Sequence, residues 1–258
     1  MNLDLEEKVV MVTGGSDGLG RALCHGLVHE GAKVALCGRD PDRLAATAES
    51  LRAAGGAVVA VQADVSRLED LERFVSASLD AWDRIDGVVN NAGRRASKKL
   101  EEIDDATWDF DLQLKLYGAA RLCRLTLPYL RRQGGSIVNV LATGAKEPGA
   151  GSAPSSVSRA AGMALTKSLS REVGADGIRV NAVLIGLIES GQWERLAAEE
   201  GIPVADVYKR MASQSNIPLG RVGRAQEFAD LVTYLLSARS SFVSGTAINL
   251  DGGMCSVV

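Results

Sequence analysis

The stretch Thr13-Gly14-Gly15-Ser16-Asp17-Gly18-Leu19-Gly20 decides the fold of this 258-residue chain. It directly follows an apolar, β-branched run and precedes a helical run. Glycine permits a tight turn and lets a phosphate approach the backbone, and a helix start offers free N–H groups and a positive dipole end. Between a strand and a helix, this cluster predicts a cradle for the pyrophosphate of a dinucleotide rather than a plain turn.

Outward from this stretch, short apolar runs alternate with helical stretches along the whole chain. The predicted strands cover residues 8–13, 33–37, 57–62, 85–89, 136–140, 178–183 and 246–250. The runs are continuous rather than alternating, as is typical of strands covered on both faces. The repeated strand-helix-strand units predict an α/β fold, with one doubly wound, Rossmann-like parallel sheet of about seven strands and helices on both faces.

No linker divides the chain, so we expect a single domain over residues 1–258. A lid-like insertion is expected at about 186–223, between the sixth strand and the last long helix. Its helical pieces would lie over the carboxyl ends of the strands, where open α/β sheets bind their ligands.

Composition excludes several classes of protein. Hydrophobic residues make up 46% and charged residues 24%, which is ordinary globular usage and argues against a disordered or fibrous chain. A net charge of -3 gives no reason to expect nucleic acid or anionic lipid as a partner. No run approaches the ~20 apolar residues of a membrane span, and the acidic start lacks a signal-peptide core, so we expect a cytoplasmic protein. Two histidines without a third ligand argue against a metal site.

The end of the second strand indicates which dinucleotide is bound. An acid about 20 residues past the glycines grips a ribose hydroxyl of NAD, whereas a nearby arginine accommodates the 2′-phosphate of NADP. Gly38 stands where that acid is expected, and Arg39 follows it. Asp40, before Pro41, is expected to cap the next helix. We therefore predict NADP(H) in preference to NAD(H), although a carboxylate at Asp17 could repel the 2′-phosphate.

Several motifs together resemble those of the short-chain dehydrogenase/reductase family over nearly the whole chain. The glycine spacing resembles that family's cofactor motif, and 63–65 its adenine-contacting segment. The segment 90–93 (Asn-Asn-Ala-Gly) matches its motif after the fourth strand, and 186–190 its nicotinamide-contacting stretch. The resemblance implies an NAD(P)-dependent oxidoreductase. It implies the following cofactor-binding residues: Gly14, Ser16, Asp17, Gly18, Leu19, Gly20, Arg39, Asp64, Val65, Asn91, Ala92, Gly93, Arg159, Ile188 and Ser190.

The family's Asn-Ser-Tyr-Lys catalytic set is substituted throughout. Alignment by the neighbouring motifs places Lys115 at the Asn position and Ala142 at the Ser position. Ser155 and Arg159 stand at the Tyr and Lys positions. No tyrosine in the chain has a lysine four residues later, so no other register restores the pattern.

These substitutions still allow a proton donor. Hydride transfer to a carbonyl develops negative charge on oxygen, which must be stabilised and protonated. A lysine in a dry site beside Arg159 would have its pKa lowered by burial and like charge, so Lys115 is the expected donor. Arg159 stays protonated and is expected to bind the cofactor ribose. Ser155, a poor acid without an evident base, completes the candidate catalytic set.

Other interpretations of these positions remain open. Lys115 could be a surface lysine or pair with Glu147 or Glu189, and Ser155 could merely start a helix after Pro154. On the insertion, Tyr208 and Glu189 are secondary proton-donor candidates. Trp193 could line an apolar substrate pocket or pack in a core.

The leading hypothesis is an atypical NADP(H)-dependent oxidoreductase acting on a small carbonyl or alcohol substrate. One alternative is a catalytically inactive, cofactor-binding subunit that partners an active homologue, and another is a non-redox lyase or isomerase that reuses the fold. The family resemblance implies a homo-tetramer or dimer, and the lost catalytic set leaves a hetero-oligomer open.

Overall fold

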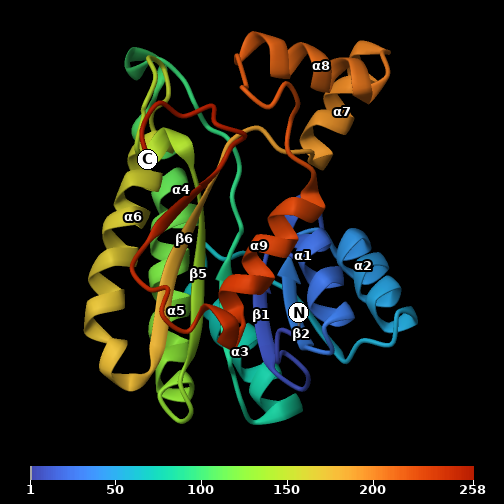
Figure 1. Cartoon of the computed structure of the whole chain (residues 1–258), viewed down its shortest axis with the longest axis vertical. Coiled ribbons are helices and arrows are strands. Elements are labelled where there is room, and N and C mark those ends of the chain that lie inside the picture. The colour runs from blue at the N-terminus through green and yellow to red at the C-terminus, as the bar shows by residue number, and fades with distance from the viewer. Residues whose placement is uncertain (1) are drawn as a thin grey trace.

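A parallel sheet forms the centre of the molecule in the computed structural model, which describes residues 2–258 apart from the side chain of Gln192 (Figure 1). Within those residues, seven strands lie in the order β3-β2-β1-β4-β5-β6-β7, and every neighbouring pair is parallel. The strands are β1 Val9–Thr13, β2 Lys33–Gly38, β3 Val58–Gln62, β4 Gly87–Asn90, β5 Gly135–Ala142, β6 Ile178–Ile185 and β7 Ala247–Leu250. The predicted fold class is confirmed.

Helices cover both faces of the sheet. They are α1 Gly18–His29, α2 Pro41–Ala53, α3 Leu68–Trp82, α4 Asp105–Leu112, α5 Gly118–Leu130, α6 Ser155–Glu172, α7 Gly191–Glu200, α8 Val204–Gln214 and α9 Ala225–Leu236. Successive β1 side chains face opposite layers: Val10 and Val12 pack with α1, α2 and α9, and Met11 packs with α3, α5 and α6. This accounts for the continuous apolar strand sequences. No helix in the described residues is long and apolar enough to cross a membrane.

The strand order reverses its direction of growth at β1. From β1 the chain proceeds to β2 and β3 on one side, and then crosses back to β4, which pairs with the other edge of β1. The loops after β1 and β4 therefore leave in opposite directions and open a crevice at the carboxyl ends of the strands. Apart from Arg159, which lies on α6, the predicted cofactor residues follow strand ends, so they gather along this edge.

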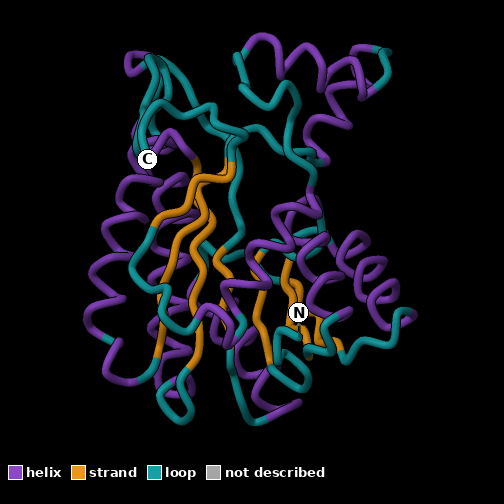
Figure 2. Tube along the Cα trace, viewed as in Figure 1, coloured by secondary structure: helices purple, strands orange, loops and turns teal. Residues whose placement is uncertain are grey.

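Helices α7 and α8 lie in the insertion that was predicted as a lid. They stand beyond one end of the strands, with loops running up to them (Figure 2). They pack on an apolar cluster of their own, which includes Val207, Met211, Ile217 and Val222 and is separate from the clusters on the sheet. That this insertion closes over a ligand stays a prediction.

The helical segment before β5 is interrupted by a single π-helical turn, Gln113–Tyr117, between α4 and α5. The N–H of Gly118 bonds to the carbonyl of Gln113, five residues earlier. A Cβ at Gly118 would lie only 2.9 Å from the carbonyl oxygen of Val65, so the helix packs tightly against the loop after β3 here. Turns of this kind are frequent at functional sites, and this one contains Lys115.

Arg179 on β6 ties the sheet to the end of α9. Its guanidinium donates to the carbonyls of Leu235 at 2.8 Å and Ser237 at 2.9 Å, and to the hydroxyl of Ser240 at 2.7 Å. Burial lowers the pKa of Arg179. The cation thus satisfies carbonyls that the helix end leaves without intrahelical partners.

We expect Arg179→Met to lower the free energy of unfolding by about 2–3 kcal/mol, because it removes several charge-assisted hydrogen bonds between β6 and the end of α9. Chemical denaturation monitored by circular dichroism measures this. Arg171→Met, at an exposed position near the end of α6, is the matched control. Equal stability of the two variants would contradict the assigned role.

Candidate functional site: the carboxyl edge of the sheet

The glycine loop is built by close packing around the junction of β1 and α1. Gly14 and Gly18 adopt positive φ values of 65° and 49°, which side chains other than glycine rarely tolerate. A Cβ at Gly20 would lie 2.2 Å from the carbonyl oxygen of Gly14, so only glycine lets the helix start this close to the loop. Ser16, Asp17 and Leu19 lie on the same turn, which brings the predicted glycine-loop residues together.

The segment after β4 braces this loop. The Thr13 hydroxyl accepts hydrogen bonds from the backbone N–H groups of Asn91 at 2.9 Å and Ala92 at 3.0 Å. The Asn91 amide donates to the carbonyls of Thr13 at 2.9 Å and Gly14 at 3.2 Å. The Asn91 side chain therefore positions the loop. Gly93 lies against Arg159, where a Cβ would come within 2.6 Å of the guanidinium.

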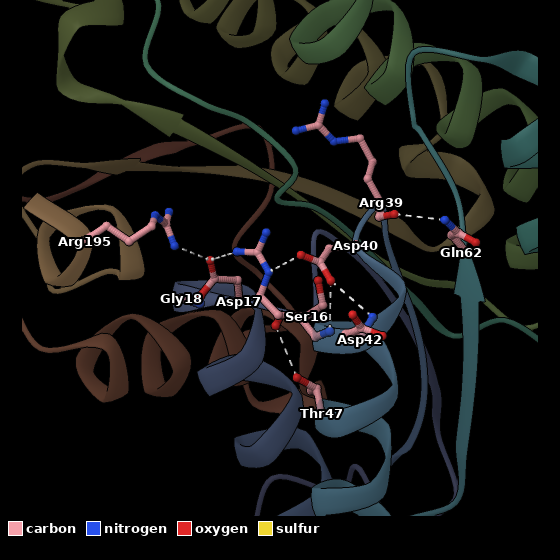
Figure 3. Close-up of polar contacts among 10 residues, drawn as sticks. Ser16, Asp17, Gly18, Arg39, Asp40, Asp42, Thr47, Gln62 and Arg195 are labelled. Atoms are coloured by element: carbon pink, nitrogen blue, oxygen red, sulfur yellow. Dashed lines mark hydrogen bonds and ion pairs between the residues drawn. The ribbon is translucent and has the colours of Figure 1, made fainter. Parts of the chain in front are cut away.

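The end of β2 carries a positive charge at Arg39 and no acid at Gly38. A Cβ at Gly38 would lie 2.4 Å from the hydroxyl oxygen of Ser16, so the Ser16 side chain occupies the place of an acid there. Arg39 is exposed, and its side chain extends away from the carboxylates of Asp17 and Asp40 (Figure 3). Asp40 caps α2 by accepting from the backbone N–H groups of Asp42 and Arg43, which confirms the predicted cap.

Asp17 is neutralised by two arginines. Its Oδ1 accepts from the backbone N–H of Gly18 at 2.8 Å and caps α1. Its Oδ2 lies 3.0 Å from Arg43 Nη1 and 3.3 Å from Arg195 Nη1. Arg43 comes from α2 and Arg195 from α7, so Asp17 also connects the insertion to the glycine loop (Figure 3). These two arginines offset the repulsion that was expected between the Asp17 carboxylate and a 2′-phosphate.

The residues after β3 have mainly structural contacts. Asp64 Oδ1 accepts from the N–H of Ser66 at 3.0 Å and from its hydroxyl at 2.7 Å, which forms a turn. Val65 is buried in the apolar cluster beneath α3 and α5. Both residues lie at the predicted edge of the sheet.

The segment after β6 leaves one polar group unsatisfied. Ile188 is buried, and Ser190 lies next to Gly18, where a Cβ would be 3.7 Å from the Cβ of Ser190. In the part of the chain that the structure describes, the buried Ser190 hydroxyl has no hydrogen-bond partner. Such an orphaned group is costly. A polar cofactor group here would satisfy it, and with the glycine cradle this fits a bound dinucleotide.

Lys115 and Ser155 meet deeper in the site. The Lys115 side chain is only 1% exposed and forms an ion pair with Asp111, one helical turn earlier and equally buried. Lys115 Nζ also lies 2.7 Å from the hydroxyl oxygen of Ser155, at the start of α6. Ser158, on the next turn of α6, donates to the other oxygen of Asp111 at 2.6 Å. Helix α4, the π-helical turn and α6 thus hold one continuous polar network.

The surroundings adjust the acidity of Lys115. Burial lowers its pKa to about 8, and the charges of Arg159 and Arg94 act in the same direction, against the hydrogen bond and charge of Asp111. The expected combination of burial and like charge is therefore present. At neutral pH the ammonium form predominates, but it gives up its proton far more readily than an exposed lysine.

Arg159 lies between Gly93 and the strand β5, where it donates to the carbonyl of Val140. Burial lowers its pKa to about 10, so it stays protonated near neutral pH. It lines one small cavity together with Lys115, Asn90, Ala92 and Leu114. The three candidate catalytic residues are therefore brought together.

Two of the alternatives for Lys115 are wrong. It is not a surface lysine, and its acidic partner is Asp111 rather than Glu147 or Glu189, because the helix turns it inward. Ser155 does start α6 after Pro154, but its hydroxyl caps no backbone group of that helix and contacts Lys115 instead.

The secondary candidates lie on the insertion. Tyr208 and Trp193 both pack on its apolar cluster. Burial, with the charges of Glu189 and Glu194, raises the pKa of Tyr208, which makes it a weaker acid.

Sequence reasoning missed Asp111 and Ser158. The available signal was spacing: Asp111 lies four residues before Lys115, and such pairs share one face of a helix. Ser158 could not be found this way, because its contact with Asp111 joins segments 47 residues apart.

Comparison with known proteins identifies the same family that the sequence motifs resemble. A family model described as enoyl-(acyl carrier protein) reductase matches residues 14–255. The 3-oxoacyl-acyl-carrier-protein reductase FabG of Thermotoga maritima is 31% identical over 251 residues, covering 97% of this chain and 98% of the relative.

Two solved structures extend the likeness. The L-sorbose reductase of Gluconobacter frateurii, complexed with NADPH and L-sorbose, superposes with a TM-score of 0.94 at 32% identity and covers 100% of each chain. An NADPH-bound short chain oxidoreductase of Pseudomonas aeruginosa PAO1, described as containing an atypical catalytic center, has a TM-score of 0.92 at 33% identity, covering 98% of this chain and 100% of that one. The chain therefore belongs to the short-chain dehydrogenase/reductase family and is an NAD(P)-dependent oxidoreductase.

Proposed function

We propose that this protein is an NADP(H)-dependent oxidoreductase of a small carbonyl or alcohol substrate, in which Ser155, Lys115 and Asp111 replace the family's usual proton donors. One observation carries the proposal. Ser155 Oγ receives hydrogen bonds from the N–H of Ala96 at 3.0 Å and from Lys115 at 2.7 Å. A backbone N–H and a charged ammonium are donors only, so both use the lone pairs of Ser155 Oγ. The single O–H of Ser155 is therefore left to donate to a substrate oxygen.

In the reduction direction, the cofactor when bound supplies a hydride to the carbonyl carbon, and the π electrons move to the carbonyl oxygen. Ser155 donates its proton to that oxygen, which gives the alcohol. Lys115 passes a proton from Nζ to Ser155 Oγ and becomes neutral, and it regains a proton from solvent. An alkoxide product is at least as basic as a serine alkoxide, so the weak acidity of Ser155 is no obstacle when Lys115 resupplies it.

Asp111 and Ser158 act as positioning residues. A buried ammonium needs a counter-ion, and Asp111 supplies it while the Ser158 hydroxyl satisfies the second carboxylate oxygen. Arg159 is proposed to bind the nicotinamide-side ribose and to stabilise negative charge developing on the substrate oxygen.

The preference for NADP(H) is proposed from the end of β2. Ser16 fills the place of a ribose-binding acid beside Gly38, and Arg39 is free to hold a phosphate bidentately. The NADPH complexes of both solved relatives support this choice of cofactor. The comparisons do not favour an inactive subunit or a non-redox enzyme.

The proposed relay predicts a distinct pH profile. Because donation requires charged Lys115, kcat/KM for carbonyl reduction should be level at neutral pH and fall as pH rises through about 8, and alcohol oxidation should show the opposite trend. Lys115→Arg keeps the positive charge beside Asp111 but does not titrate in this range. Steady-state rates of both enzymes against pH provide the test, and an unchanged break in the variant would exclude Lys115 as its origin.

Removing the Ser155 hydroxyl should impair the chemical step rather than cofactor binding. We expect Ser155→Ala to lower kcat by about 10²–10⁴-fold while the Kd for NADPH stays unchanged. Ser156→Ala is the control, since the Ser156 hydroxyl bonds to Ser152. Stopped-flow absorbance of NADPH measures the step. Equal loss in both variants would rule out a direct role for Ser155.

Cofactor choice should depend on Arg39. We expect Arg39→Met to raise the Kd for NADPH about tenfold or more, because a charge-assisted bidentate contact to the 2′-phosphate is lost. NADH, which lacks this phosphate, is the internal control and should bind as before. Fluorescence titration measures both constants. A parallel loss for the two nucleotides would show that Arg39 does not discriminate between them.

A further inference from the structure

The loop that follows β4 carries two adjacent arginines past the proposed catalytic network. Gly93, the third residue of this loop, lies against the guanidinium of Arg159. Three residues later, the N–H of Ala96 bonds to the Ser155 hydroxyl at 3.0 Å. Arg94 and Arg95 are therefore held between two contacts with the site.

Of these two arginines, Arg94 also contacts an aromatic ring. Its guanidinium lies over the ring of Phe110 on α4, 4.2 Å from the ring centroid. Phe110 immediately precedes Asp111, which pairs with Lys115. A cation over an aromatic face is stabilised while its N–H edges remain available to a ligand. The charge of Arg94 also reaches the ammonium of Lys115, whose pKa it helps to lower.

The cations around this site exceed its anions. Across residues 2–258, no ion pair includes Arg94 or Arg159, so the Asp111 carboxylate is paired with Lys115 alone. Three cations thus converge on a region with one carboxylate in contact. Such a surplus attracts a negatively charged ligand and penalises a positive one.

We propose that the substrate of this site carries an anionic oxygen group, a carboxylate or a phosphate ester, in addition to its reactive carbonyl, and that Arg94 binds that group. This inference rests on the proposed function, because the group belongs to the same substrate. The planar guanidinium can hold either oxyanion through two parallel hydrogen bonds. Arg94 is then a specificity-determining residue, and Ser155 and Lys115 act on the carbonyl.

The test compares three short ketones of the same carbon skeleton: an oxo acid, its methyl ester and a phosphate ester. Each is titrated by calorimetry into the NADPH complex of the wild-type protein and assayed for NADPH oxidation. We expect at least one anionic ketone to bind about tenfold or more tightly than the methyl ester. Preference for the acid assigns a carboxylate, and preference for the phosphate ester assigns a phosphate.

Arg94→Met should abolish that preference, whereas Arg95→Met, the neighbouring arginine without the Phe110 contact, should retain it. Equal binding of the ester and both anionic ketones by the wild type, or equal effects of the two substitutions, would overturn the inference. Reduction of the methyl ester distinguishes this inference from the proposed function. Turnover of the ester without a preference for the anionic ketones would overturn the inference and leave the proposed function standing. Absence of turnover with all three ketones would count against the proposed function, and the binding data would still decide the role of Arg94.

Discussion

The molecule depends on one topological constraint, the reversal of strand order at β1. Because all the strands are parallel, their carboxyl ends meet at one edge, and because the chain grows outward from β1 in two directions, the loops there diverge. The glycine loop, Arg39 and the 91–93 segment reach the same edge from three strands. The contacts of Thr13 with Asn91 and Ala92 then lock two of these loops together across the crevice.

A second constraint acts within the site. The buried charge of Lys115 must be neutralised, but the ammonium must still be able to give up its proton. Asp111 compensates the charge of Lys115, yet burial and the neighbouring arginines still lower the pKa of this lysine to about 8. A fully exposed ammonium would be a poor donor, and a buried one without a partner would not be charged. Asp111 on α4 and Lys115 in the π-helical turn are both buried, so one helical segment supplies an acid and its counter-ion.

Much of the fold and part of the site could be predicted from the sequence. The strands follow from continuous apolar runs, and the cradle from glycines between a strand and a helix, because these signals are local. The environment of Lys115 followed only in outline. Its burial could be expected from its position beside Arg159, and the local signal for its partner Asp111 was a spacing of four residues along one helix. Ser158 and Arg195 were not predictable, because their contacts with Asp111 and Asp17 join distant segments.

Helices α7 and α8 pack around an apolar cluster of their own, separate from those on the sheet. Substitutions inside that cluster can therefore accumulate without disturbing the hydride-transfer machinery below. Their effects reach the rest of the molecule through contacts such as the pairing of Arg195 with Asp17. Over evolutionary time, such a separate cluster lets the insertion change its sequence while the nucleotide-binding half stays the same.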